Sequence, residues 1–108
     1  MSFNRKLLAA TILVASLLAT SAKAEKLTLL LDWFINPDHA PLYVALEKGY
    51  FKEAGLDITM PAPADPNDPP KLVAAKKADL AISYQPQLHI QVAEGLPLRR
   101  IATLVATP

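Results

Sequence analysis

The chain has 108 residues, of which 11 are basic, 10 are acidic and none is cysteine. This near balance of charge lacks the basic footprint of a nucleic-acid-binding protein. Without cysteine there is neither a disulfide framework nor a thiol for a lipoprotein anchor, so core packing alone has to hold the fold together.

Residues 1–24 have the three-part pattern of a secretory signal peptide. Arg5 and Lys6 form a basic start, residues 7–19 are uncharged and apolar, and Ala22-Lys23-Ala24 is a small-x-small cleavage site. An uncleaved anchor is the weaker alternative, because a membrane-spanning helix needs about 20 apolar residues. We therefore expect a periplasmic domain over residues 25–108. It would carry a net charge of −2, because three basic residues and no acidic one lie in the leader.

The domain is expected to start with a strand and a helix. Residues 26–31 are almost continuously apolar, which is typical of a parallel strand covered on both faces. A helix is predicted over residues 38–48, with Asp38 at or close to its N-cap and Gly49 as the left-handed residue that ends it. Its expected buried face consists of Leu42, Ala45 and Leu46.

Three further segments continue the alternation. Residues 50–54 predict one short helical turn, and residues 56–60 alternate apolar and polar side chains as an edge strand does. The proline-rich residues 61–70 predict a loop into a helix over residues 71–77, with Asp68 as its N-cap.

The remaining sequence predicts two strands around one helix. Residues 80–82 form the third strand, Pro86 opens a helix to about Glu94, and residues 99–106 form a fourth strand. The order β-α-β-α-β-α-β predicts an α/β fold with a parallel sheet.

The loop after the first strand is the first candidate for a ligand site, because open α/β sheets bind ligands at the carboxyl ends of their strands. Trp33, the chain's only tryptophan, either covers the end of the core or stacks on a flat ligand. Asp32 either orders the loop or accepts a hydrogen bond from an exocyclic amine. Asn36 suits the edge of a heterocycle, although Asn36-Pro37 is also a turn signal. His39 is either a neutral imidazole that binds a neutral ligand or a residue of the helix cap.

The loop after the third strand is expected to form the second wall of the site. Ser83, Tyr84 and Gln85 lie there, where Tyr84 offers a ring face and a hydroxyl and Gln85 offers an amide.

His89 falls inside the following helix and is interpreted as structural or solvated. Two separated histidines predict no metal site. No nucleophile motif and no phosphate-binding glycine loop occurs, so these residues indicate a ligand crevice without covalent chemistry, catalytic residues or cofactors.

Several segments together resemble the substrate-binding proteins of ABC transporters for thiamine pyrimidine precursors. They read LDWFINPDHAPLYVALEKGYFKEAGLDI, KKADLAISYQPQ and EGLPLRRIATL, and the D-W-x-x-N-x-x-H pattern of Asp32, Trp33, Asn36 and His39 is their most selective part. The resemblance implies a type II periplasmic binding fold, whose two lobes close on a hydroxymethylpyrimidine or a formylaminopyrimidine. It also implies an ABC permease as the partner and the only link to the membrane.

Two alternatives remain within the same superfamily. The part GYFKEAGLD is shared with sulfonate- and nitrate-binding proteins, but an anion site calls for arginine at strand ends, and Arg99 and Arg100 are expected at the beginning of a strand. The other alternative is a pyrimidine synthase that uses pyridoxal phosphate held on a lysine, and a histidine of its own. The resemblance puts Ser83 and Gln87 at those two positions, which favours the binding protein.

The resemblance covers only the N-terminal part of a complete family member, which is about three times longer. We therefore expect residues 25–108 to form the first part of lobe 1, with the second lobe absent from this chain. One wall of a cleft shields a ligand poorly from water, so weak binding is expected from these residues alone.

Overall fold

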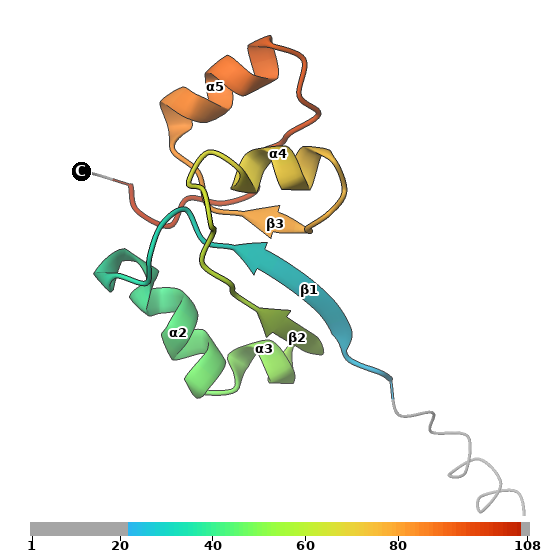
Figure 1. Cartoon of the computed structure of the whole chain (residues 1–108). Coiled ribbons are helices and arrows are strands. Elements are labelled where there is room, and N and C mark those ends of the chain that lie inside the picture. Colours follow the sequence, from blue (N-terminus) through green and yellow to red (C-terminus); the bar gives the residue numbers. More distant parts are fainter. Residues whose placement is uncertain (1–21, 107–108) are drawn as a thin grey trace, which may run out of the picture.

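The computed structural model describes residues 22–106, and these fold around a parallel sheet with the strand order β2-β1-β3 (Figure 1). The central strand is β1 (Glu25–Leu30), with β2 (Leu56–Thr59) on one edge and β3 (Leu80–Ala81) on the other. The amino-terminal part of β1 pairs with β2, and Leu29 and Leu30 pair with β3. Both pairings are parallel, as predicted, so the exits of β1 and β3 point to the same end of the sheet.

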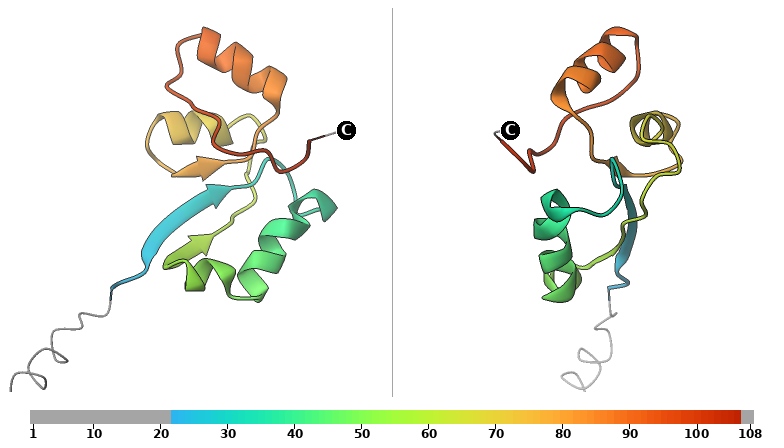
Figure 2. Two further views of the ribbon diagram at one scale, coloured as in Figure 1. Left: turned by 180° about the vertical axis from the view of Figure 1, so that it is seen from behind. Right: turned by 60° about the vertical axis from the view of Figure 1, so that its left-hand side comes forward.

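Helices follow each strand and lie on both faces of the sheet, which confirms the predicted α/β class. Figure 2 shows α2 and α3 on one face and α4 on the other. The helical elements are the 3-10 helix η1 (Pro37–His39), α2 (Ala40–Glu47), α3 (Tyr50–Glu53), α4 (Pro69–Ala74) and α5 (Gln85–Ala93). None of the helices in the described range is both long enough and apolar enough to cross a membrane. The predicted signal peptide lies almost wholly outside residues 22–106, so its cleavage stays a prediction.

The predicted fourth strand, residues 99–106, is wrong for this structure. The segment is exposed, and no backbone hydrogen bond between described residues joins it to β3. A strand needs a neighbouring edge of matching length, and β3 pairs with β1 over only Leu80 and Ala81. The apolar residues of the segment therefore have β propensity but no ladder to join.

The core is small and lies at the carboxyl end of β1. Leu30 and Leu31 are its buried apolar side chains, and Pro69 and Pro70 of α4 are also buried. On α2 the expected buried face is only half covered, and Leu46 is exposed, which corrects the prediction for that residue. The reason is that the short strands of this sheet cover little of the helix.

The helix ends follow local chemistry, with one correction at the start of η1. Asn36, and not Asp38, is the N-cap, because its side chain accepts a hydrogen bond from the backbone N–H of Asp38 at 2.9 Å. Asp68 occupies the predicted N-cap position of α4, although its side chain makes no capping hydrogen bond. Gly49 ends α2 with φ of 77°, as predicted.

Helix α4 ends earlier than the expected residue 77. Lys76 adopts the left-handed conformation with φ of 59°, and its N–H bonds to the carbonyl of Val73 at 2.9 Å. The N–H of Lys77 bonds to the carbonyl of Leu72 at 2.8 Å. These two bonds form a Schellman motif, which stops a helix, here with lysine in the place where glycine is more usual.

Candidate functional site

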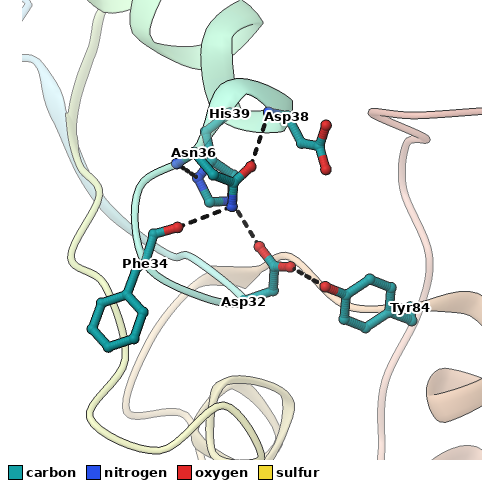
Figure 3. Close-up of polar contacts among 6 residues, drawn as sticks. All are labelled: Asp32, Phe34, Asn36, Asp38, His39 and Tyr84. Carbon is teal, nitrogen blue, oxygen red and sulfur yellow. Dashed lines mark hydrogen bonds and ion pairs between the residues drawn. The ribbon is translucent and has the colours of Figure 1, made fainter.

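The candidate site is built around the carboxylate of Asp32, at the exit of β1. The preceding residue, Leu31, is fully buried and anchors the loop in the core. Asp32 Oδ1 lies 2.7 Å from His39 Nε2, and its Oδ2 accepts a hydrogen bond from the Tyr84 hydroxyl at 2.6 Å (Figure 3). Asp32 therefore joins the exits of β1 and β3, and its side chain is only 12% exposed.

His39 is oriented by the cap of the helix it begins. Its side chain is 1% exposed, and its Nδ1 accepts the backbone N–H of Asn36 at 3.3 Å. Since Nδ1 is an acceptor, the ring hydrogen sits on Nε2 and is donated to Asp32. Both ring nitrogens are thus engaged within the protein. Of the two roles considered for His39, these contacts correspond to that of a residue in the helix cap. Neither ring nitrogen is free to contact a ligand directly in this structure.

Asn36 is also engaged in the loop. Its Oδ1 accepts the N–H of Asp38, and its Nδ2 donates to the carbonyl of Phe34 at 2.9 Å. The turn interpretation therefore describes its contacts, and contact with a heterocycle stays a prediction that would require these bonds to be exchanged.

The hydrogen bonds around Asp32 shift two pKa values in opposite directions. Burial by itself raises the pKa of Asp32, but the hydrogen bonds from Tyr84 and His39 outweigh it and hold this pKa below its ordinary value. The hydrogen bond to Asp32, together with partial burial and the nearby negative charge, raises the pKa of Tyr84. Asp32 is therefore a carboxylate and Tyr84 a neutral phenol at physiological pH.

The loop carries an apolar surface next to this network. Trp33 is 49% exposed, and Phe34 and Ile35 are more exposed still. The rings of Trp33 and Phe34 pack edge to face, with centroids 5.4 Å apart and an interplanar angle of 84°. Phe34 and Ile35 were not among the predicted site residues. The continuous apolar run Trp33-Phe34-Ile35, inside a loop otherwise rich in polar residues, is the signal that could have found them.

The exit of β3 contributes Tyr84 to the site. The residues on either side of it, Ser83 and Gln85, form hydrogen bonds with side chains of α5 instead. Ser83 Oγ donates to Gln87 Oε1 at 3.0 Å. Gln85 is the first residue of α5 and not a loop residue, and its Nε2 lies 3.3 Å from Nε2 of the exposed His89. Of the three residues predicted here, Tyr84 alone is joined to Asp32 by a hydrogen bond in the described structure.

Arg100 contacts the first residue of α5. Its Nη1 donates to Gln85 Oε1 at 3.3 Å. The expectation that Arg99 and Arg100 begin a strand is wrong, because residues 99–106 form none. One exposed guanidinium still falls short of the several converging donors that a dedicated anion site requires. No three His, Cys, Asp or Glu side chains within residues 22–106 gather as metal ligands do.

Comparisons with known proteins found one matching family and several similar proteins. The family described as NMT1/THI5 like matches residues 36–108. A putative thiamine biosynthesis protein of Haemophilus influenzae is 56% identical over 84 residues, which cover 78% of this chain and 27% of the relative. A formylaminopyrimidine-binding protein of Halalkalibacterium halodurans is 42% identical over 84 residues, which cover 78% of this chain and 26% of that protein.

Enzymes are also among the similar proteins. A 4-amino-5-hydroxymethyl-2-methylpyrimidine phosphate synthase of Saccharomyces cerevisiae is 37% identical over 84 residues, which cover 78% of this chain and 25% of the synthase. The chain thus spans about a quarter of the length of the curated relatives it matches.

Proposed function

The chain belongs to the NMT1/THI5-like family, and from this membership we propose that it binds a pyrimidine precursor of thiamine for import by an ABC transporter. The family has a periplasmic-binding-protein-like fold, of which residues 22–106 form a small α/β part. The similarity to a protein named for binding formylaminopyrimidine supports the proposed ligand. The ligand is a hydroxymethylpyrimidine or a formylaminopyrimidine.

The observation that carries the proposal is the pairing of a half-exposed indole with a carboxylate at the carboxyl end of the sheet. Trp33 follows Asp32 directly, and the Tyr84 hydroxyl lies 2.6 Å from the carboxylate. An aromatic face suits a flat heterocycle, and a carboxylate accepts hydrogen bonds from its amino group. An aminopyrimidine can use both groups, whereas the negative charge of Asp32 would repel an anion.

Binding without catalysis is favoured over a synthase. The resemblance assigns the lysine and histidine of the enzyme to the positions of Ser83 and Gln87, whose side chains are hydrogen-bonded to each other at 3.0 Å. Ser83 has no amine to hold an aldehyde cofactor, and Gln87 has no imidazole to supply atoms for a pyrimidine. The similarity to named synthases keeps the enzyme as the second candidate.

The proposed location is the periplasm, with a membrane permease as the partner. The basic start, apolar run and cleavage site of residues 1–24 support export. Intact-mass measurement of the periplasmic fraction tests this, and the expected species begins at Glu25. A species that keeps the whole leader would contradict the proposal.

The binding proposal is tested by calorimetric titration of the full-length protein with 4-amino-5-hydroxymethyl-2-methylpyrimidine, its formylamino counterpart and taurine as a sulfonate. Saturable binding of a pyrimidine, with quenching of the Trp33 fluorescence, is the expected result. Binding of taurine without binding of either pyrimidine would favour the anion-binding alternative. Formation of a pyrimidine product with pyridoxal phosphate present would favour the enzyme.

A further inference from the structure

The network of His39, Asp32 and Tyr84 has a fixed direction of hydrogen bonding, and this direction bears on which ligands fit. We propose that the network presents only hydrogen-bond acceptors to the ligand, and so selects molecules with an N–H donor at that edge over analogues with a carbonyl there. The inference deepens the proposed function and rests on it, because it concerns the choice between closely related pyrimidines.

The direction is set first at His39. The backbone N–H of Asn36 points at Nδ1 at 3.3 Å, so the single hydrogen of the neutral ring is on Nε2. This hydrogen is donated to Asp32 Oδ1 across 2.7 Å. With 1% of the side chain exposed, His39 has little access to water that could support the other tautomer.

The direction is completed at Tyr84. A phenol has one hydrogen, and Tyr84 donates it to Asp32 Oδ2 at 2.6 Å. The lowered pKa of Asp32 and the raised pKa of Tyr84 both favour this arrangement. What remains for a ligand is the lone pairs of the Tyr84 oxygen and of the carboxylate. Tyr84 is 63% exposed, so most of this side chain is open to a ligand that approaches from the solvent.

An amine and a carbonyl on the ligand therefore differ in how they interact with the Tyr84 oxygen and the Asp32 carboxylate. An amino N–H completes a hydrogen bond to the phenol oxygen or the carboxylate, while a carbonyl brings a third acceptor against two others. Leaving polar groups of a binding site without their partners is the strongest basis for rejecting an analogue. Because Tyr84 is partly exposed, we expect a preference of about tenfold or more, at the lower end of what such mismatches produce.

Asp32→Asn provides a sharp test because the rest of the network dictates how the new amide lies. The Nε2–H of His39 requires the amide oxygen at the position of Oδ1, so the amide NH₂ faces the Tyr84 oxygen. Tyr84 can then no longer donate inward, and its hydrogen turns toward the ligand. The edge changes from acceptor to donor, and the carbonyl analogue should become the preferred ligand.

The experiment compares 4-amino-5-hydroxymethyl-2-methylpyrimidine with the analogue in which oxygen replaces the 4-amino group. Affinities are measured by calorimetry on the full-length protein, on Asp32→Asn, on Tyr84→Phe and on the double variant. The wild type should prefer the amine by about tenfold or more, and Asp32→Asn should reverse or abolish this preference. The double variant should still favour the carbonyl analogue over the amine, because the amide NH₂ of the new asparagine remains a donor when the phenol is gone. Tyr50→Phe, which removes the hydroxyl of an exposed tyrosine on α3, is the matched control and should behave as the wild type.

The outcomes separate this inference from the proposed function. If the wild type binds neither pyrimidine, the proposed function fails. If it binds both equally well, the proposed function stands and the inference is overturned. The inference is also overturned if Asp32→Asn binds both ligands with the preference of the wild type. If Asp32→Asn fails to fold, the test uses the ratio of the affinities for the amine and the carbonyl analogue. The inference holds if the wild type prefers the amine and Tyr84→Phe keeps this preference, because Asp32 is still an acceptor there, and it is overturned if either protein shows no preference.

Discussion

Replacing Trp33 with alanine should weaken ligand binding more than the loss of folded protein explains. About half of the side chain is exposed, at 49%, and this is the surface proposed to stack on the pyrimidine. Stacking of a base on an aromatic ring contributes about 1–3 kcal/mol, so Trp33→Ala should weaken binding roughly 5- to 150-fold. Trp33→Phe should lose less, because it keeps an aromatic face.

The covered half of Trp33 sets the expected cost in stability. A buried aromatic side chain removes about 200 Å² from water, so half coverage corresponds to about 100 Å² and at most about 2.5 kcal/mol. Part of this comes from the edge-to-face contact with Phe34 at 5.4 Å. Trp33→Ala should therefore lower the free energy of unfolding as well as the ligand affinity.

Two measurements on the same variants separate these effects. Urea denaturation followed by circular dichroism gives the free energy of unfolding, and calorimetry at a concentration where the protein is folded gives the affinity. Ile35→Ala is the control, because it removes an exposed apolar side chain from the same loop without removing an aromatic face. An unchanged affinity in Trp33→Ala with reduced stability would refute the stacking role and leave Trp33 as a cover of the core.

Three further predictions concern stability. Tyr84→Phe removes a hydrogen-bond donor from Asp32 and should lower the free energy of unfolding by about 1 kcal/mol at neutral pH. This is less than a buried hydrogen bond to a charged group contributes, because the bond is partly exposed to water. Because the pKa of folded Asp32 is lowered, the stabilisation is present above the ordinary pKa of the carboxyl and is lost as pH falls through the folded value. The two proteins should therefore converge in acid unfolding curves, and a constant difference down to low pH would contradict this. Asn36→Ala should lose about 1 kcal/mol in urea denaturation, whereas Asp68→Ala should lose much less because its side chain makes no capping bond, and equal losses would count against this. Gly49→Ala should cost about 1 kcal/mol through strain at φ of 77° alone, since a new Cβ would meet no atom within 4 Å, and a stabilised variant would be the contrary result.

The local elements of this protein could be predicted from the sequence because short-range chemistry specifies them. Glycines at positions 49 and 95 have positive φ and end helices, and Pro86 lies in the first turn of α5. The same reasoning placed Asp32 and Tyr84 at exits of parallel strands, which is enough to bring them to one end of the sheet. The rule says nothing about which side chains then touch.

Only the tertiary structure decided how those side chains are used. Asp32 and Tyr84 are 52 positions apart, and whether a phenol donates to a carboxylate depends on distances set by the whole sheet. Burial of His39 and the N–H of Asn36 together decide its tautomer, and neither is visible in the residue pattern. Residues 99–106 have the composition of a strand, yet pairing is a property of two segments, and β3 is too short to provide the second. Local sequence thus determined the helices, turns and strand exits, while long-range contacts determined the hydrogen-bond network of the site.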